Sequence, residues 1–98
     1  MTIQEIIDNE TVTLKIDGRL DTVTAPEFEK TVSALGEEVK HLILDMEGLN
    51  YISSAGLRVL LAAQKKMNQL GTMKVVKVCD VVMDVIEMTG FADILEIE

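Results

Sequence analysis

The stretch that decides the fold is residues 41–61, HLILDMEGLNYISSAGLRVLL. Its apolar run, residues 42–44, ends at Asp45, a polar loop follows, and a Ser-Ser-Ala-Gly turn opens a long amphipathic segment. A buried strand that leads through a loop into a helix is typical of α/β proteins. The turn places two hydroxyls, Ser53 and Ser54, where unpaired backbone N–H groups and the helix dipole favour an anion. We therefore predict that a charge can be added and removed at this turn.

Two strand candidates and one helix precede this stretch. Residues 11–17 alternate apolar with polar side chains, and residues 3–8 form a second strand candidate across the turn Asn9-Glu10. The segment Thr24-Ala-Pro-Glu27 fits a capping box, in which Thr24 caps the helix and Glu27 reaches back to it. The helix is predicted to stop at Gly36 and to present one apolar face, which consists of Ala25, Phe28, Val32 and Leu35.

Strands and helices alternate after the central strand. A long helix is predicted from about residue 54 to residue 70, followed by a strand over 73–78, a short helix over 81–89 and a last strand over 94–98. The inner face of the long helix is predicted to consist of Leu57, Leu60, Leu61, Gln64 and Met67. The order is thus β-β-α-β-α-β-α-β. Strands separated by helices need crossover connections, so the sheet is predicted to be mixed and mostly parallel, with an antiparallel strand at its N-terminal end.

Length and charge narrow the possible functions. The 98 residues are expected to form one domain over 1–98, and the net charge of −8 disfavours nucleic acid and anionic membrane surfaces as partners. A basic protein surface is the natural counterpart of such a chain. The first residues lack the basic, apolar and small-residue progression of a signal peptide, so none is expected, and no apolar run approaches the roughly 20 residues that a spanning helix needs. We expect a cytoplasmic protein.

Catalytic and metal-binding motifs are missing from the sequence. The single histidine, His41, is predicted to lie at the far end of the central strand, whose two ends are roughly 15 Å apart, so it cannot reach Ser54 as a serine hydrolase would require. No glycine-rich nucleotide loop occurs, and one histidine with one cysteine makes no metal-ligand set. Asp45 and Glu47 are more simply read as solvated carboxylates. We therefore predict no catalytic residue, no cofactor and no metal.

The serine turn has a structural and a functional interpretation. Serine at a helix start is common because its oxygen accepts a backbone N–H, but two adjacent serines exceed what capping requires. A small apolar patch is predicted on the outward side of the helix, formed by Ala55, Arg58, Val59 and Ala62. A phosphoryl group beside it would add about −1.5 to −2 charge and expel a partner that packs there. Arg58 could pair with that phosphate or with a partner carboxylate.

Three motifs give the chain a resemblance to a known family. They are Gly18-Arg-Leu-Asp21 with Thr24-Ala-Pro-Glu27, Leu42-Ile-Leu-Asp45-Met-Glu-Gly-Leu, and Tyr51-Ile-Ser-Ser-Ala-Gly-Leu-Arg58. With these residues the chain resembles a STAS domain, specifically a stand-alone anti-sigma factor antagonist, over essentially all 98 residues. The resemblance implies an α/β fold with helices packed largely on one face of the sheet. It also implies that Asp21 and Asp45 join the serine turn and the outward patch in binding a partner.

The resemblance further implies a partner switch. The unphosphorylated antagonist would bind an anti-sigma factor that is also a serine kinase of the histidine-kinase-like ATPase type. The kinase would phosphorylate a serine at the start of the second helix, which ends the interaction, and a PP2C-type phosphatase would restore it. The chain itself would be substrate and ligand, not an enzyme, and a monomer when free.

The chain departs from the family pattern at one position. The pattern Asp-Ser-Ser/Thr-Gly-Leu accepts phosphate on the hydroxyl before glycine, and alignment on Gly56-Leu57 puts Ala55 at that acceptor position. We expect acceptance to move to Ser54, with Ser53 as the second choice. Two alternatives remain open. One is a constitutive accessory subunit, for example of a lipid-transport ATPase complex, and the other is a small-ligand-binding regulatory domain with its site at the carboxyl edge of the sheet near Asp45.

Overall fold

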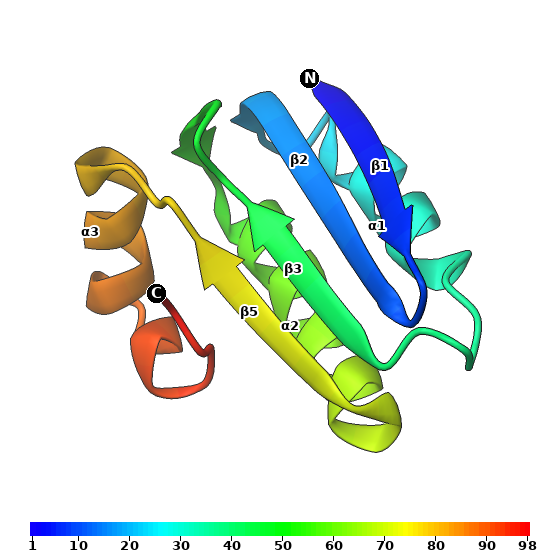
Figure 1. The fold of residues 1–98 in the computed structure, drawn as a ribbon. Helices are drawn as coiled ribbons and strands as arrows, with labels where there is room; N and C mark the ends of the chain where they lie inside the picture. Colours follow the sequence, from blue (N-terminus) through cyan, green and yellow to red (C-terminus); the bar gives the residue numbers. More distant parts are fainter.

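The computed structural model describes residues 1–98, and its five-stranded sheet carries helices on one face (Figure 1). The strands are β1 (Thr2–Asp8), β2 (Thr11–Leu20), β3 (His41–Asp45), β4 (Leu49–Ile52) and β5 (Thr72–Val76). The helices are α1 (Ala25–Ser33), α2 (Ser54–Leu70) and α3 (Asp80–Met88), followed by the short 3₁₀ helix η1 (Phe91–Asp93). Figure 1 shows α1 and α2 behind the sheet and α3 beside its β5 edge. The predicted fold class is confirmed.

The sheet is mixed, as the sequence predicted. Its order is β1-β2-β3-β5, with β4 paired to β2. Only β1 runs antiparallel to its neighbour β2, whereas the pairs β2–β3, β2–β4 and β3–β5 are parallel. Leu14 lies opposite Leu44 and Leu44 opposite Val75, so one face of three strands is continuously apolar. The helices cover that face.

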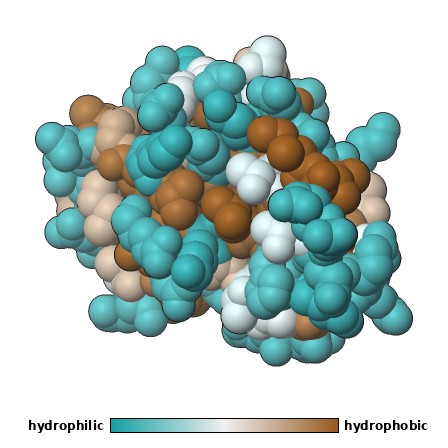
Figure 2. Space-filling view, viewed as in Figure 1, coloured by the Kyte–Doolittle hydropathy of each residue, from teal (hydrophilic) through white to brown (hydrophobic).

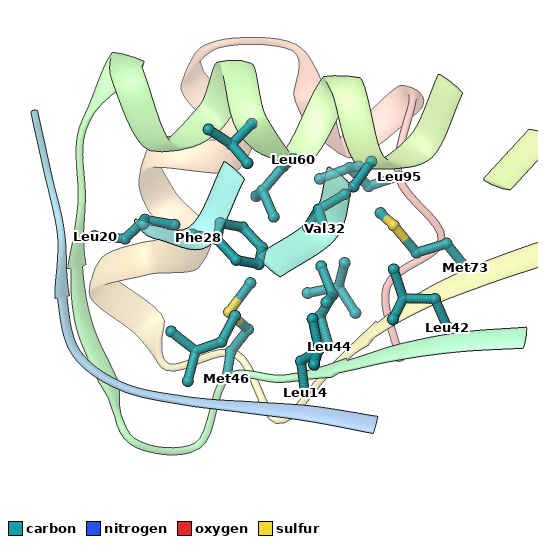
Figure 3. Close-up of a cluster of buried hydrophobic side chains, with 14 of the residues drawn as sticks. Leu14, Leu20, Phe28, Val32, Leu42, Leu44, Met46, Leu60, Met73 and Leu95 are labelled. Atoms are coloured by element: carbon teal, nitrogen blue, oxygen red, sulfur yellow. The ribbon is translucent and has the colours of Figure 1, made fainter. Parts of the chain in front are cut away.

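The buried side chains of both layers meet in one cluster (Figure 3). Phe28 and Val32 from α1 and Leu60 from α2 point toward Leu14 and Leu44 of the sheet in this view. All five are at most 5% exposed. Because this aliphatic cluster fixes α1 and α2 on the same sheet face, it also fixes the first turns of the two helices relative to each other.

Strand β2 changes partner along its length. Its first half pairs with β3 and its last residues with β4, with a β-bulge between Gly18 and Arg19. Gly18 has a φ of +102°, which favours glycine, and its N–H donates to the Gly48 carbonyl at 2.8 Å. The sequence did not predict β4, because Leu49–Ile52 lacks a period-2 pattern: its two central residues are both exposed.

Thr24 is at the N-cap of α1, as predicted, but the expected capping-box hydrogen bonds do not form. Thr24 has helical φ and ψ, and its hydroxyl donates to the Arg19 carbonyl at 2.8 Å and accepts from the Asp21 N–H at 2.9 Å. Asp21 supplies the turn instead, since its Oδ1 accepts the N–H groups of Val23 at 3.0 Å and Thr24 at 3.1 Å. This is an Asx-type turn, in which a side chain mimics a backbone acceptor. The loop before α1 is therefore organised by Asp21.

The two C-terminal strands are shorter than expected. β5 ends at Val76 because Lys77 takes a φ of +58°, and the expected strand over 94–98 is reduced to one bridge between Val75 and Ile97. The sheet face that no helix covers is largely polar, with a band of apolar side chains across its middle (Figure 2). None of the helices has the length and apolar character to cross a bilayer.

Candidate functional site

Ser53 is the structural cap of α2. Its backbone is extended, with φ −103° and ψ 175°, and its Oγ accepts the Gly56 N–H at 3.5 Å. Its own N–H donates to the Leu20 carbonyl at 2.9 Å, which ties the turn to the end of β2. Ser53 is half-buried. The hydroxyl and backbone of this residue are thus used in holding the strand-to-helix turn.

Ser54 is the first residue of α2, and it differs from its neighbour in every one of these respects. It is exposed, and its hydroxyl makes no hydrogen bond to another protein group. The first turn of α2 carries no acidic residue, so nothing there neutralises the positive end of the helix dipole. Arg58, one turn later, donates from Nε to the Ser54 carbonyl at 3.4 Å. An anion on Ser54 would therefore meet unpaired N–H groups and a guanidinium.

The outward patch predicted on α2 is only partly correct. Arg58 and Ala62 are exposed and Ala55 is half-buried, but Val59 is buried, with 5% of its surface exposed. The prediction for Val59 was wrong because it considered the sheet as the only partner of α2, whereas α1 packs on that side. Leu61, which was predicted on the inner face of α2, is only half-buried.

A groove separates α1 and α2 beside the serine turn. Its volume is about 460 Å³, and both helices contribute to its walls. The lining residues are Thr22, Ala25, Pro26, Glu29, Ala55, Arg58, Val59 and Ala62. All four residues of the predicted α2 patch therefore line it. We call this feature the α1–α2 groove.

Asp21 lies in the loop between β2 and α1. The N–H of Thr24, which donates to its carboxylate, holds the pKa of Asp21 below its ordinary value of 3.8. Arg19 Nε lies 3.7 Å from Asp21 Oδ2, and the Arg19 guanidinium stacks over the Tyr51 ring at 4.1 Å from its centroid. Sequence reasoning missed Arg19 and Tyr51, because they become neighbours only through the β2–β4 register, and β4 was not foreseen.

Asp45 is brought to a different position from the serine turn. It is 7% exposed, its Oδ1 accepts the Glu47 N–H at 3.0 Å, and its Oδ2 lies 3.7 Å from Lys77 Nζ. It shares the uncovered face of the sheet with its register partner Lys15. The carboxylate thus ties the β3–β4 loop to the end of β5. Direct contact between Asp45 and a partner stays a prediction.

The remaining chemically interesting side chains lie elsewhere. His41 begins β3, at the end opposite Asp45, and its Nδ1 is 2.8 Å from Thr72 Oγ1. Cys79 is half-buried and its Sγ lies 3.4 Å from the Leu49 carbonyl. No three His, Cys, Asp or Glu residues lie close enough together to hold a metal ion.

The fold and the turn together define an α/β domain whose candidate site is a surface: an exposed helix start, a flanking groove and a charged loop. Comparison with known proteins gives the family. Residues 2–98 match the STAS domain, and the chain therefore belongs to the STAS domain family. The resemblance seen in the sequence motifs is confirmed.

Several relatives are anti-sigma factor antagonists by name. The anti-sigma-B factor antagonist of Staphylococcus aureus is 23% identical, with 99% of this chain and 92% of the relative aligned. An anti-sigma factor antagonist from Mycobacterium paratuberculosis has a similar structure, with a TM-score of 0.87, 23% identity, and coverage of 98% of this chain and 83% of that one. Unphosphorylated SpoIIAA gives a TM-score of 0.78 at 18% identity, with 99% and 87% covered, and SpoIIAA has also been solved in its phosphorylated form.

Proposed function

We propose that this chain is an anti-sigma factor antagonist, which binds an anti-sigma factor through the surface around Ser53 and Ser54. Support comes from the names of relatives that align along nearly the whole chain. The observation that carries the proposal is the free, exposed hydroxyl of Ser54 at the start of α2. A hydroxyl in this place can take a charge without any change to the core, because the side chain contacts solvent.

The partner in this proposal is also a serine kinase, of the histidine-kinase-like ATPase type. It would transfer phosphate to Ser54, and a PP2C-type phosphatase would remove it. The phosphate adds about −1.5 to −2 charge at neutral pH. Placed beside the α1–α2 groove and close to Asp21, this charge would repel an acidic or apolar partner surface. The bound state would therefore belong to the unmodified protein.

Ser54 is preferred over Ser53 as the acceptor. Ser53 is half-buried and its Oγ accepts the Gly56 N–H, so a phosphate there would displace the cap of α2. Ala55, at the usual acceptor position of the family, has no hydroxyl and turns its side chain into the α1–α2 groove. Phosphate on Ser54 would lie within reach of the Arg58 side chain, one helical turn away.

In this proposal the chain acts as substrate and ligand and not as a catalyst. No histidine lies near Ser54 to serve as a general base, since His41 is at the start of β3 and is hydrogen-bonded to the Thr72 hydroxyl. The proposed partners regulate transcription, so the chain would act in the cytoplasm. It would be a monomer when free.

The test is incubation with a candidate anti-sigma factor kinase and ATP, followed by mass mapping of the modified residue. We expect phosphate on Ser54 and none in Ser54→Ala, which should still bind the kinase. Ser54→Asp should bind more weakly. Undiminished phosphorylation of Ser54→Ala would move the site to Ser53 or elsewhere and contradict the assignment.

A second candidate function is favoured by Ala55 alone. The acceptor position of the family is occupied here by an alanine, which suits a constitutive accessory subunit, for example of a lipid-transport ATPase complex. In that case no kinase would phosphorylate the chain, and Ser54→Asp would not weaken binding to its partner. The two functions are therefore separated by the same pair of variants.

A further inference from the structure

The α1–α2 groove adjoins the serine turn and has a volume of about 460 Å³. Most of its apolar lining residues are small, with Ala25 on α1 and Ala55 and Ala62 on α2. Ala25 and Val59 are buried and form its floor, while Ala55 is half-buried and Ala62 exposed. No side chain of this protein fills the space between them. An apolar floor open to solvent on an acidic protein is a feature that a partner can bury.

The two rims of the groove carry opposite charges. Glu29 stands on the α1 side and Arg58 on the α2 side, and both are exposed. Glu29 takes part in no ion pair and in no side-chain hydrogen bond within the chain. Arg58 uses only its Nε, in a long bond of 3.4 Å to the Ser54 carbonyl. Both rim charges are therefore available to a partner. Because they lie on opposite rims, they would fix the orientation in which a partner binds across the groove.

We propose that the α1–α2 groove receives one large aliphatic side chain of the anti-sigma factor, with a basic residue of that partner facing Glu29 and an acidic one facing Arg58. The inference rests on the proposed function, because it assumes that an anti-sigma factor is the partner. A basic residue at the α1 rim also fits the net charge of −8, which favours basic partner surfaces. The groove thereby sets which anti-sigma factor is bound, while Ser54 sets when it is bound.

The size of the expected effect follows from burial. Removing one large aliphatic side chain from water favours association by about one to two orders of magnitude in Kd. Filling the groove from within should therefore cost a similar factor. Ala62→Leu does this from an exposed helical position, and leucine is nearly as good a helix former as alanine. Ala34→Leu, at an exposed position at the end of α1 and outside the groove, makes the same chemical change as a control.

The experiment measures Kd by calorimetry between the unphosphorylated protein and the anti-sigma factor that binds the wild-type chain. We expect Ala62→Leu and Glu29→Lys each to weaken binding about tenfold or more. The controls Ala34→Leu and Glu37→Lys, the latter an exposed acid outside the groove, should stay within about twofold. Glu29→Lys keeps the test decisive if Ala62→Leu unfolds the chain, which circular dichroism would detect.

Failure of the proposed function and failure of the groove proposal give different results in this experiment. If no anti-sigma factor binds the wild-type chain, the proposed function is wrong. If one binds but Ala62→Leu, still folded, and Glu29→Lys bind like the wild type, the groove is not the docking site and the inference is overturned. A loss of affinity that is equal in Glu29→Lys and Glu37→Lys would also overturn it, because the effect would then come from net charge and not from the groove.

Discussion

The ammonium of Lys66 on α2 lies 2.6 Å from the carbonyl oxygen of Leu35, just beyond the end of α1. The same Nζ lies 3.0 Å from the Val32 carbonyl and 3.3 Å from that of Ser33. The last carbonyls of a helix lack intrahelical partners, and a cation there also complements the helix dipole. One side chain of α2 thus fastens the end of α1, and so holds together the two walls of the α1–α2 groove.

Replacement of Lys66 by methionine should destabilise the fold. Methionine keeps most of the aliphatic stem but removes the ammonium, so the carbonyls lose a charged donor. We expect the free energy of unfolding to fall by about 1–2 kcal/mol. Urea denaturation would measure it, with the exposed neighbour Lys65→Met as the control. Equal stability of the two variants would show that the Lys66 contacts contribute nothing.

Asp21 should make stability depend on pH at the acid end. Its pKa is held below 3.8, chiefly by the N–H of Thr24, so the folded state favours the carboxylate. The resulting stabilisation is present above the unfolded pKa and is lost as the pH falls through the lower folded value. Asp21→Asn keeps an oxygen for both N–H groups but cannot ionise. The wild type should therefore be the more stable at pH 7, and the gap in urea midpoint should close on acidification. A gap that is independent of pH would contradict this.

Gly56 is required by the packing under the serine turn. A Cβ at this position would come within 2.7 Å of Leu20 Cγ and 2.9 Å of Ile52 Cγ1. Alanine gains about 1 kcal/mol of helix propensity over glycine, but overpacking a core costs about 1–3 kcal/mol. Gly56→Ala should therefore lower the melting temperature, and the amide resonances of Ser53 and Ser54 should shift with it. A more stable variant would show that the core adapts at no cost.

The sequence predicted the layers of this fold better than its contacts. Alternating strands and apolar helix faces are local patterns, and they gave the mostly parallel sheet and the position of the serine turn. Val59 was misplaced because a helical wheel shows which residues share a face, not how many partners the helix has. The pairing of Arg19 with Tyr51 depended on β4, whose two exposed central residues break the strand pattern. The turn-forming role of Asp21 was readable in principle, since an aspartate four residues before the first residue of a helix is a local turn signal.

The two serines should separate into a structural and a regulatory residue. Ser53→Ala removes the oxygen that accepts the Gly56 N–H, and loss of a helix cap costs about 0.5–2 kcal/mol. Because the hydrogen bond from the Gly56 N–H to Ser53 Oγ is long, at 3.5 Å, we expect a loss of stability at the lower end of that range. Ser54→Ala removes an exposed hydroxyl without a partner, so its stability should stay within about 0.5 kcal/mol of the wild type. Thermal unfolding and phosphate incorporation should both be measured for the two variants. We expect Ser53→Ala to be less stable than the wild type but still phosphorylated, and Ser54→Ala to be as stable as the wild type but unmodified. The reverse pattern would make Ser53 the regulatory residue and Ser54 the structural one. The phosphate that controls partner binding would then lie on Ser53.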